Sequence, residues 1–155
     1  MSAVGVASGA VAGLVAITPA SGFVGVMGAL AIGFGAGVLC YLAVQLRTKT
    51  GLDDALEVFA VHGIGGIWGA LATGIFAVAA IGGTASLIEG NPGQMLTQIV
   101  AVVATAGYCL IVSLVILKIL DIIPGLGIRV SEQDEDEGLD VVAHGESAYI
   151  ADGAN

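Results

Sequence analysis

Three long stretches of this 155-residue chain contain no Asp, Glu, Lys or Arg, and they limit the possible folds more than any other feature. The stretches are residues 1–46, 58–88 and 90–117. About 20 apolar residues are enough for a helix to cross the ~30 Å hydrocarbon core of a bilayer. Hydrophobic residues make up 57% of the chain, and its mean hydropathy is +1.00, which is above the range of soluble domains. We therefore predict an all-α membrane protein with four transmembrane helices.

Turn signals mark the ends of the four predicted helices. Pro19, in the sequence TPASG, disfavours helix at Thr18. The polar sequence RTKTGLDD separates the second helix from the third; Asp53 or Asp54 suits the cap of the third helix, and Glu57 suits its first turn. The predicted helices cover residues 3–18, 23–46, 54–80 and 94–123, within a membrane part at residues 1–124.

An acidic tail, residues 125–155, follows the membrane part. Eight of the thirteen acidic residues lie between Glu132 and Asp152, so the net charge of -9 belongs mainly to this tail. With four spans, all basic residues fall on one side of the membrane, and basic residues mark the cytoplasmic side. We predict a multi-pass protein of the cell membrane with a cytoplasmic tail; no basic segment follows Met1, so no signal peptide is predicted. The basic residues are Arg47, Lys49, Lys118 and Arg129.

His62 is the one titratable side chain in the charge-free stretch 58–88. If the third helix begins near Asp54, His62 lies eight residues into it, or about 12 Å along the axis. An ionisable residue at that depth usually faces a bundle interior, a cavity or a conduction path. Gly65 and Gly66 leave space beside the ring, either for a small ligand or for a close helix. Two interpretations stay open: a ring that lines a conduit, or a neutral ring that donates an N–H to a neighbouring helix.

Other polar or small residues have structural explanations of equal or greater weight. Thr18 suits a helix-end hydroxyl that bonds its own backbone, with a pore role as the alternative. Asp53, Asp54 and Glu57 would attract cations at a cytoplasmic vestibule, or would only stabilise a helix start. Trp68 suits core or subunit packing, and three glycine pairs have the spacing of helix packing. Those pairs are Gly9 with Gly13, Gly33 with Gly37, and Gly65 with Gly69.

Several classes of function are disfavoured. The sequence has no phosphate-binding loop, no nucleophile elbow and no paired cysteines, so we do not predict an enzyme. Four basic residues and a pI near 4.2 exclude nucleic-acid binding. Cys40 and Cys109 lie in predicted spans and suit reduced core residues. His144 in the tail has no second histidine or cysteine near it, so neither a metal site nor a cofactor is predicted.

Three segments resemble one known family, that of ammonium transporters, methylammonium permeases and Rhesus proteins. They look like its eighth membrane segment with the following turn, its tenth segment, and its cytoplasmic tail. Their order identifies nearly the whole chain with the carboxy-terminal part of an ammonium transporter. The segments are ASGAVAGLVAITPASGFVG at 7–25, DDALEVFAVHGIGGIWGALATGIFA at 53–77 and EGLDVVAHGESAY at 137–149.

The resemblance implies roles for individual residues. His62 matches the second of two paired pore histidines that line a narrow apolar conduit, Val58 matches an apolar conduit position, and Thr18 matches a threonine near the conduit. The family's tail packs on the cytoplasmic face, couples the subunits of a trimer and supports docking of PII-type signal proteins. Its matching residues here are Gly138, Leu139, Asp140, His144, Gly145, Glu146 and Tyr149.

The resemblance also implies a departure. Family members usually have eleven spans, of which the first seven supply an outer recruitment site, a phenylalanine gate and the first pore histidine. The leading hypothesis is therefore transport of ammonium or ammonia as the carboxy-terminal part of a transporter, inactive without the amino-terminal helices, in a homotrimer or in an assembly with those helices. The alternative is a membrane-anchored regulatory or assembly subunit whose tail binds a PII-type signal protein.

Overall fold

Helices make up the regular structure in the part of the chain that the computed structural model describes, which is residues 3–51 and 53–146. No strand occurs in those residues, and Val24 and Ala77 form an isolated bridge. Four helical segments there are long and apolar enough to cross a membrane. The prediction of an all-α membrane protein with four spans is confirmed. The segments are Ala3–Ala20, Val26–Thr50, Phe59–Phe76 and Pro92–Ile122.

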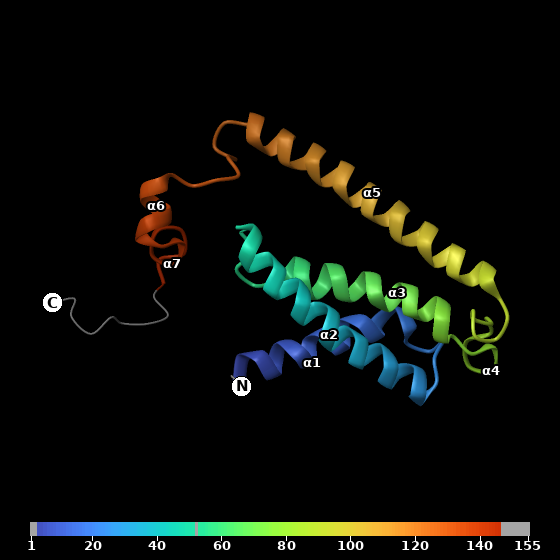
Figure 1. The fold of residues 1–155 in the computed structure, drawn as a ribbon. Coiled ribbons are helices and arrows are strands. Elements are labelled where there is room, and N and C mark those ends of the chain that lie inside the picture. The colour runs from blue at the N-terminus through green and yellow to red at the C-terminus, as the bar shows by residue number, and fades with distance from the viewer. Residues whose placement is uncertain (1–2, 52, 147–155) are drawn as a thin grey trace. The chain divides into compact units, whose positions relative to one another are not determined.

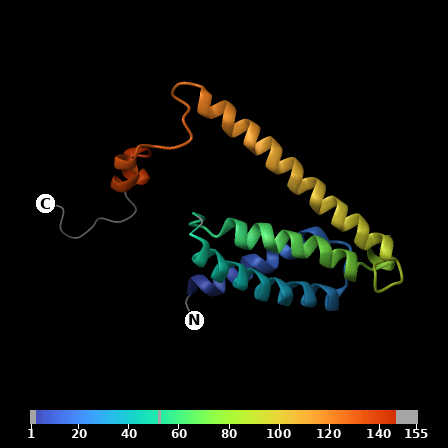
Figure 2. The same ribbon diagram turned by 45° about the horizontal axis from the view of Figure 1, so that its top comes forward.

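The first three spans pack side by side, as Figure 1 and Figure 2 both show. The first consists of α1 (Ala3–Ile17) and a short 3₁₀ turn at Thr18–Ala20 that includes Pro19. The second is α2 (Val26–Thr50). The third begins with the π-helical turn Phe59–Gly63 and continues as α3 (Ile64–Phe76).

Small side chains fill the core between these three spans. Its buried cluster contains four alanines and one larger residue, Ile32. Lipid tails are as apolar as a protein core, so membrane helices associate mainly through close van der Waals packing, and small residues permit that packing. The clustered alanines are Ala16, Ala20, Ala36 and Ala72.

One of the three predicted glycine pairs packs at a helix crossing within the chain. A Cβ added at Gly69 would collide with the Ala16 carbonyl oxygen of α1, and one added at Gly65 would lie 3.2 Å from the Cys40 sulfur of α2. The other two pairs have open space around them, because an added Cβ would meet no atom within 4 Å. Those glycines are Gly9, Gly13, Gly33 and Gly37.

Trp68 packs against the same core, in line with its predicted role. Its indole Nε1 donates a hydrogen bond to the Ile32 carbonyl at 2.9 Å. A Cβ at Gly35 would lie 2.8 Å from that nitrogen, so the ring fits only beside a residue without a side chain. Buried tryptophan usually satisfies its N–H in this way.

The segment between the third and fourth spans contains one short helix, α4 (Ala79–Gly82). The first N–H of this helix, on Ala79, donates to the Glu89 carboxylate at 2.8 Å. A carboxylate at a helix N-terminus satisfies a free N–H and favours the helix dipole. Glu89 therefore stabilises this loop.

The fourth span is α5 (Pro92–Ile122), close to the predicted residues 94–123. Proline suits the first position of a helix because the N–H that it lacks would have no partner there. The chain divides into two compact units inside this helix, Met1–Ala106 and Gly107–Asn155.

The acidic tail contains two short helices that sequence reasoning did not predict, α6 (Glu132–Glu137) and α7 (Leu139–Val142). Ser131 caps α6, since its Oγ accepts a hydrogen bond from the third N–H of the helix at 3.2 Å. Arg129 forms an ion pair with Glu135 at 3.1 Å. Both side chains are exposed, so the pair adds little stability.

We predict that Gly69→Ala lowers the free energy of unfolding of the chain in detergent micelles by about 1–3 kcal/mol, the usual cost of overpacking a core. The new Cβ would force α1 and α3 apart at the Ala16 carbonyl. Gly66→Ala on the same helix is the matched control, because its Cβ would meet no atom within 4 Å. Thermal unfolding followed by circular dichroism measures both variants, and equal stability would contradict the close crossing.

Candidate functional site

His62 lies in the π-helical turn Phe59–Gly63, which opens the third span. The N–H of Ile64 donates both to the Phe59 carbonyl, five residues back, and to the Val61 carbonyl. Such wide turns are rare, and they occur frequently at functional sites. The third span therefore begins at Phe59, and the prediction that it begins at Asp54 is wrong.

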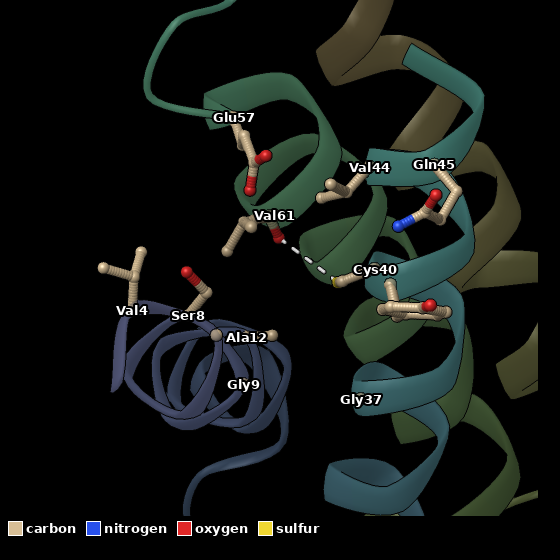
Figure 3. A pocket seen from close by; sticks show the side chains of 12 residues that line it. Val4, Ser8, Gly9, Ala12, Gly37, Cys40, Val44, Gln45, Glu57 and Val61 are labelled. Atoms are coloured by element: carbon tan, nitrogen blue, oxygen red, sulfur yellow. Dashed lines mark hydrogen bonds between the residues drawn. The ribbon is translucent and has the colours of Figure 1, made fainter. Parts of the chain in front are cut away.

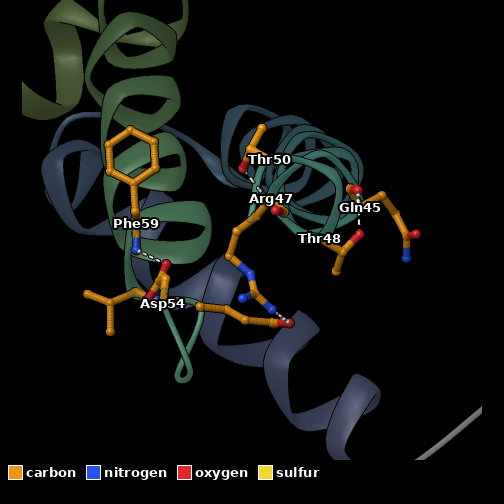
Figure 4. A network of polar contacts seen from close by, with 8 residues as sticks. Gln45, Arg47, Thr48, Thr50, Asp54 and Phe59 are labelled. Atoms are coloured by element: carbon orange, nitrogen blue, oxygen red, sulfur yellow. Dashed lines mark hydrogen bonds and ion pairs between the residues drawn. The ribbon is translucent and has the colours of Figure 1, made fainter. Parts of the chain in front are cut away.

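Asp54 caps this span from a position outside the helix. Its Oδ1 accepts the N–H of Val58 at 2.8 Å and its Oδ2 accepts the N–H of Phe59 at 2.9 Å, as Figure 4 shows for Phe59. The first N–H groups of a helix have no partner within the helix, so one carboxylate here satisfies two of them. The predicted capping role of Asp54 is confirmed, although the helix begins later than expected. Asp53 is exposed.

Glu57 ties the start of the third span to the end of α2. Its carboxylate lies 3.6 Å from the guanidinium of Arg47, and both side chains are about three-quarters buried, with 28% and 24% exposed. Glu57 was predicted in the first helical turn, but its φ is +57°, a left-handed conformation that a helix does not contain. That conformation is why the helix cannot begin before Val58.

The depth of His62 in the membrane is better judged from its neighbour α2 than from the start of its own helix. Counted from Phe59, His62 is only about one turn into the third span, so the predicted 12 Å does not hold. However, the Cys40 thiol donates to the Val61 carbonyl at 3.7 Å. Cys40 precedes Arg47 by seven residues, or about 10 Å along α2, so His62 lies well inside the apolar part of the helices.

The ring of His62 lies on a face of the third span that no described residue of the first compact unit covers. His62 is exposed, and its side chain makes no hydrogen bond or ion pair with the residues of 3–51 and 53–146. Val58, one turn earlier, has 49% of its surface exposed, and a Cβ at Gly66, one turn later, would meet nothing within 4 Å. We call Val58, His62 and Gly66 the open face. It is apolar apart from one imidazole, which can accept a hydrogen bond at one nitrogen and donate at the other when it is neutral.

The opposite side of the same turn is buried. Val61 and Gly65 face α1 and α2, and Val61 forms a cluster with Ala12 and Cys40. Sequence reasoning singled out His62 and Val58 but missed Val61 and Cys40, which contact each other on the buried side of the turn. No sequence signal marks them, because Val and Cys in an apolar span look like ordinary core residues.

A cavity of about 430 Å³ lies between α1 and α2 beside this turn (Figure 3). Ser8, Gln45, Glu57 and Val61 are among its lining residues, and His62 is not. The cavity is therefore separate from the open face.

Thr18 occupies the helix-end position predicted for it. Its hydroxyl donates to the Leu14 carbonyl of its own helix at 2.8 Å, and its side chain is exposed. No hydrogen bond joins Thr18 to Val58 or His62 in the described part of the chain. Its assignment to a conduit stays a prediction.

The predicted tail residues from Gly138 to Glu146 begin at the N-cap of α7 and continue past its end, within the second compact unit. Gly138 and Gly145 have φ of +102° and +66°, and the Glu146 N–H donates back to the Asp140 carbonyl at 2.8 Å. The His144 N–H donates to the Leu139 carbonyl at 3.3 Å, so these residues form one compact turn. Tyr149 lies outside the described residues. No three His, Cys, Asp or Glu side chains come together as a metal site in residues 3–51 and 53–146.

Comparison with known proteins decides the family. A sequence profile of the Ammonium Transporter Family matches residues 1–149. This chain belongs to the ammonium transporter family. Ammonium transporter Amt1 of Archaeoglobus fulgidus is 48% identical over 145 residues, and an ammonium transporter of Aquifex aeolicus is 53% identical over 147 residues. Each alignment covers 94% of this chain but only 37% and 34% of the relative, so the chain spans about a third of their length.

Solved structures of ammonium transporters share the fold of this chain. The crystal structure of Mep2 from Saccharomyces cerevisiae matches with a TM-score of 0.83 and 34% identity, over 100% of this chain and 36% of that chain. The crystal structure of Mep2 from Candida albicans matches with a TM-score of 0.79 and 34% identity, over 86% and 30%. The described helices therefore have the arrangement of the corresponding part of an ammonium transporter bundle.

We predict that Asp54→Ala raises the amide hydrogen exchange rates of Val58 and Phe59 about five- to tenfold, because both lose the carboxylate that binds them and a helix cap is worth about 1 kcal/mol. Asp53→Ala is the matched control: it removes the neighbouring carboxylate, which makes no hydrogen bond or ion pair with the described residues. Exchange measured by NMR in micelles tests this. Equal rates in the two variants would show that Asp54 does not hold the turn.

Proposed function

We propose that this chain forms one wall of a membrane conduit for ammonia, released from ammonium that arrives at the membrane. The observation that carries the proposal is the open face: Val58, His62 and Gly66 share one uncovered side of the third span, and His62 is its one ionisable group. Membership of the ammonium transporter family supports ammonium as the substrate.

The chemistry of the open face suits this substrate. Moving an ammonium ion through hydrocarbon is costly, because the ion loses its hydration. Neutral ammonia can pass an apolar channel while it exchanges hydrogen bonds with the channel lining. The imidazole of His62 offers one donor and one acceptor for that exchange. Val58 makes the approach to the ring apolar.

The wall that this chain supplies is incomplete by itself. No described residue of the first compact unit covers the open face, and relatives are about three times as long as the chain. We infer that the first seven spans of the family supply the rest of the conduit, either on the same protein or on a separate chain, and that the complete assembly is a trimer. The "complete transporter" below means this chain together with those seven spans.

We place the tail in the cytoplasm of a cell and propose that it contacts PII-type signal proteins. The placement rests on the positions of the four basic residues. The partner rests on the resemblance of the segment from Gly138 to Glu146 to the family tail. The compact turn after α7 gives this segment a defined shape that a partner protein could recognise.

Uptake of radiolabelled methylammonium into lipid vesicles tests the proposed function. We expect saturable uptake by the complete transporter and none above empty vesicles by this chain alone. His62→Ala in the complete transporter should lower uptake about tenfold or more, the effect of losing a hydrogen bond to a strongly polar solute in a dry site. Thr97→Ala, which removes an exposed hydroxyl bonded to the Gly93 carbonyl of its own helix, is the control and should keep wild-type uptake.

Two results would contradict the proposal. Robust saturable uptake by this chain alone would refute the incomplete wall. Unchanged uptake and unchanged proton movement in His62→Ala would remove His62 from the conduit.

A further inference from the structure

Cys40 forms the one side-chain hydrogen bond that the described residues make to the π-helical turn from a neighbouring helix. Its thiol donates to the Val61 carbonyl at 3.7 Å, across 21 residues of sequence (Figure 3). The side chain is 3% exposed. Val61 immediately precedes His62, so this bond acts on the backbone that carries the ring.

The space around the thiol is specific. A Cβ at Gly65 would lie 3.2 Å from the Cys40 sulfur, so the glycine makes room for the sulfur in this position. Ala12 and Val61 bury the thiol from two other sides. A carbonyl at membrane depth gains from a donor within reach, and the Val61 carbonyl accepts from the Ile64 N–H as well as from this thiol.

The geometry of a π turn gives this contact an effect on His62. A π turn contains one residue more than an α turn, and one residue corresponds to about 100° of rotation in an α-helix. If the turn closed to α geometry, the residues on its two sides would rotate relative to each other by about that angle. Val58, which precedes the turn, would then rotate by about that angle relative to Gly66, which follows it, and His62, inside the turn, would rotate by part of it, so the alignment of the three residues would change.

We propose that Cys40 is a positioning residue for His62: its thiol holds the Val61 carbonyl, keeps the turn Phe59–Gly63 wide, and so keeps the imidazole on the open face. The proposal rests on the proposed function of His62 as a conduit residue. It concerns a contact between α2 and the third span, and it involves no reaction of the thiol.

Uptake by the complete transporter is the first test. Cys40→Ala removes the donor and should lower methylammonium uptake about two- to fivefold, the effect of one weak hydrogen bond. Cys40→Ser keeps a donor and should restore part of that loss. Cys109→Ala, which removes the exposed cysteine of α5, is the matched control and should keep wild-type uptake.

Observing the His62 ring directly distinguishes a positioning role of Cys40 from a role in stability alone. In the full chain with His144→Ala, His62 is the remaining histidine, and the ¹⁵N NMR signals of its imidazole report its surroundings. We expect Cys40→Ala to shift these signals and Cys40→Ser to shift them less. Unchanged signals in a folded Cys40→Ala variant would overturn the proposal, as would equal effects of serine and alanine.

A third measurement needs no variant at Cys40. In the Cys109→Ala chain the S–H stretching band in the infrared spectrum comes from Cys40 alone. A hydrogen-bonded thiol absorbs at a lower frequency than a free one, so we expect a lowered band. A band at the free-thiol frequency would overturn the proposal even if Cys40→Ala failed to fold.

The two proposals fail separately. If His62→Ala leaves uptake unchanged, the proposed function fails, whatever Cys40 does. If His62→Ala lowers uptake but Cys40→Ala does not, only the positioning role fails. Where His62→Ala retains measurable uptake, Cys40→Ala should add no further loss in that background, because residues that act through one another are not additive.

Discussion

The close crossing of α1 and α3 at Gly69 decides which side of the third span faces protein and which side stays uncovered. The Ala16 carbonyl takes the place where a side chain on Gly69 would be, and Gly65 makes similar room for Cys40 one turn earlier. Membrane helices have no hydrophobic drive to associate, so this kind of contact fixes their rotation. With Gly65, Gly69 and Ala72 turned inward, Gly66 faces away from the core, and the wide turn before it leaves Val58 and His62 exposed.

The start of the third span then determines where the His62 ring lies. Asp54 satisfies the first N–H groups, and Glu57, paired with Arg47, breaks the helix before Val58. In the wide turn that follows, the Val61 carbonyl accepts a hydrogen bond from the Cys40 thiol of α2. Three side-chain hydrogen bonds and one ion pair thus act on the residues that precede His62.

The sequence predicted the fold class and the four spans because hydropathy along a chain reports directly on membrane helices. It also singled out His62, as an ionisable residue in an apolar stretch, and Val58, through a family resemblance; their place in a conduit stays a prediction. The start of the third span could not be predicted, because it depends on the left-handed backbone conformation of Glu57, which a glutamate rarely adopts. Spacing alone could not show that Gly65 and Gly69 pack while Gly9 and Gly13 do not, and nothing local indicated that Cys40 meets Val61.

The central claim is that the open face is the wall of a conduit that other spans complete. The most direct test attaches a spin label to Gly66→Cys, in a Cys109→Ala background, and measures its collisions with oxygen dissolved in the bilayer. The account predicts frequent collisions in this chain alone and several-fold fewer in the complete transporter, where the missing spans would separate the open face from lipid. Equal collision rates in this chain alone and in the complete transporter would show that the open face contacts lipid in the transporter and does not line a conduit.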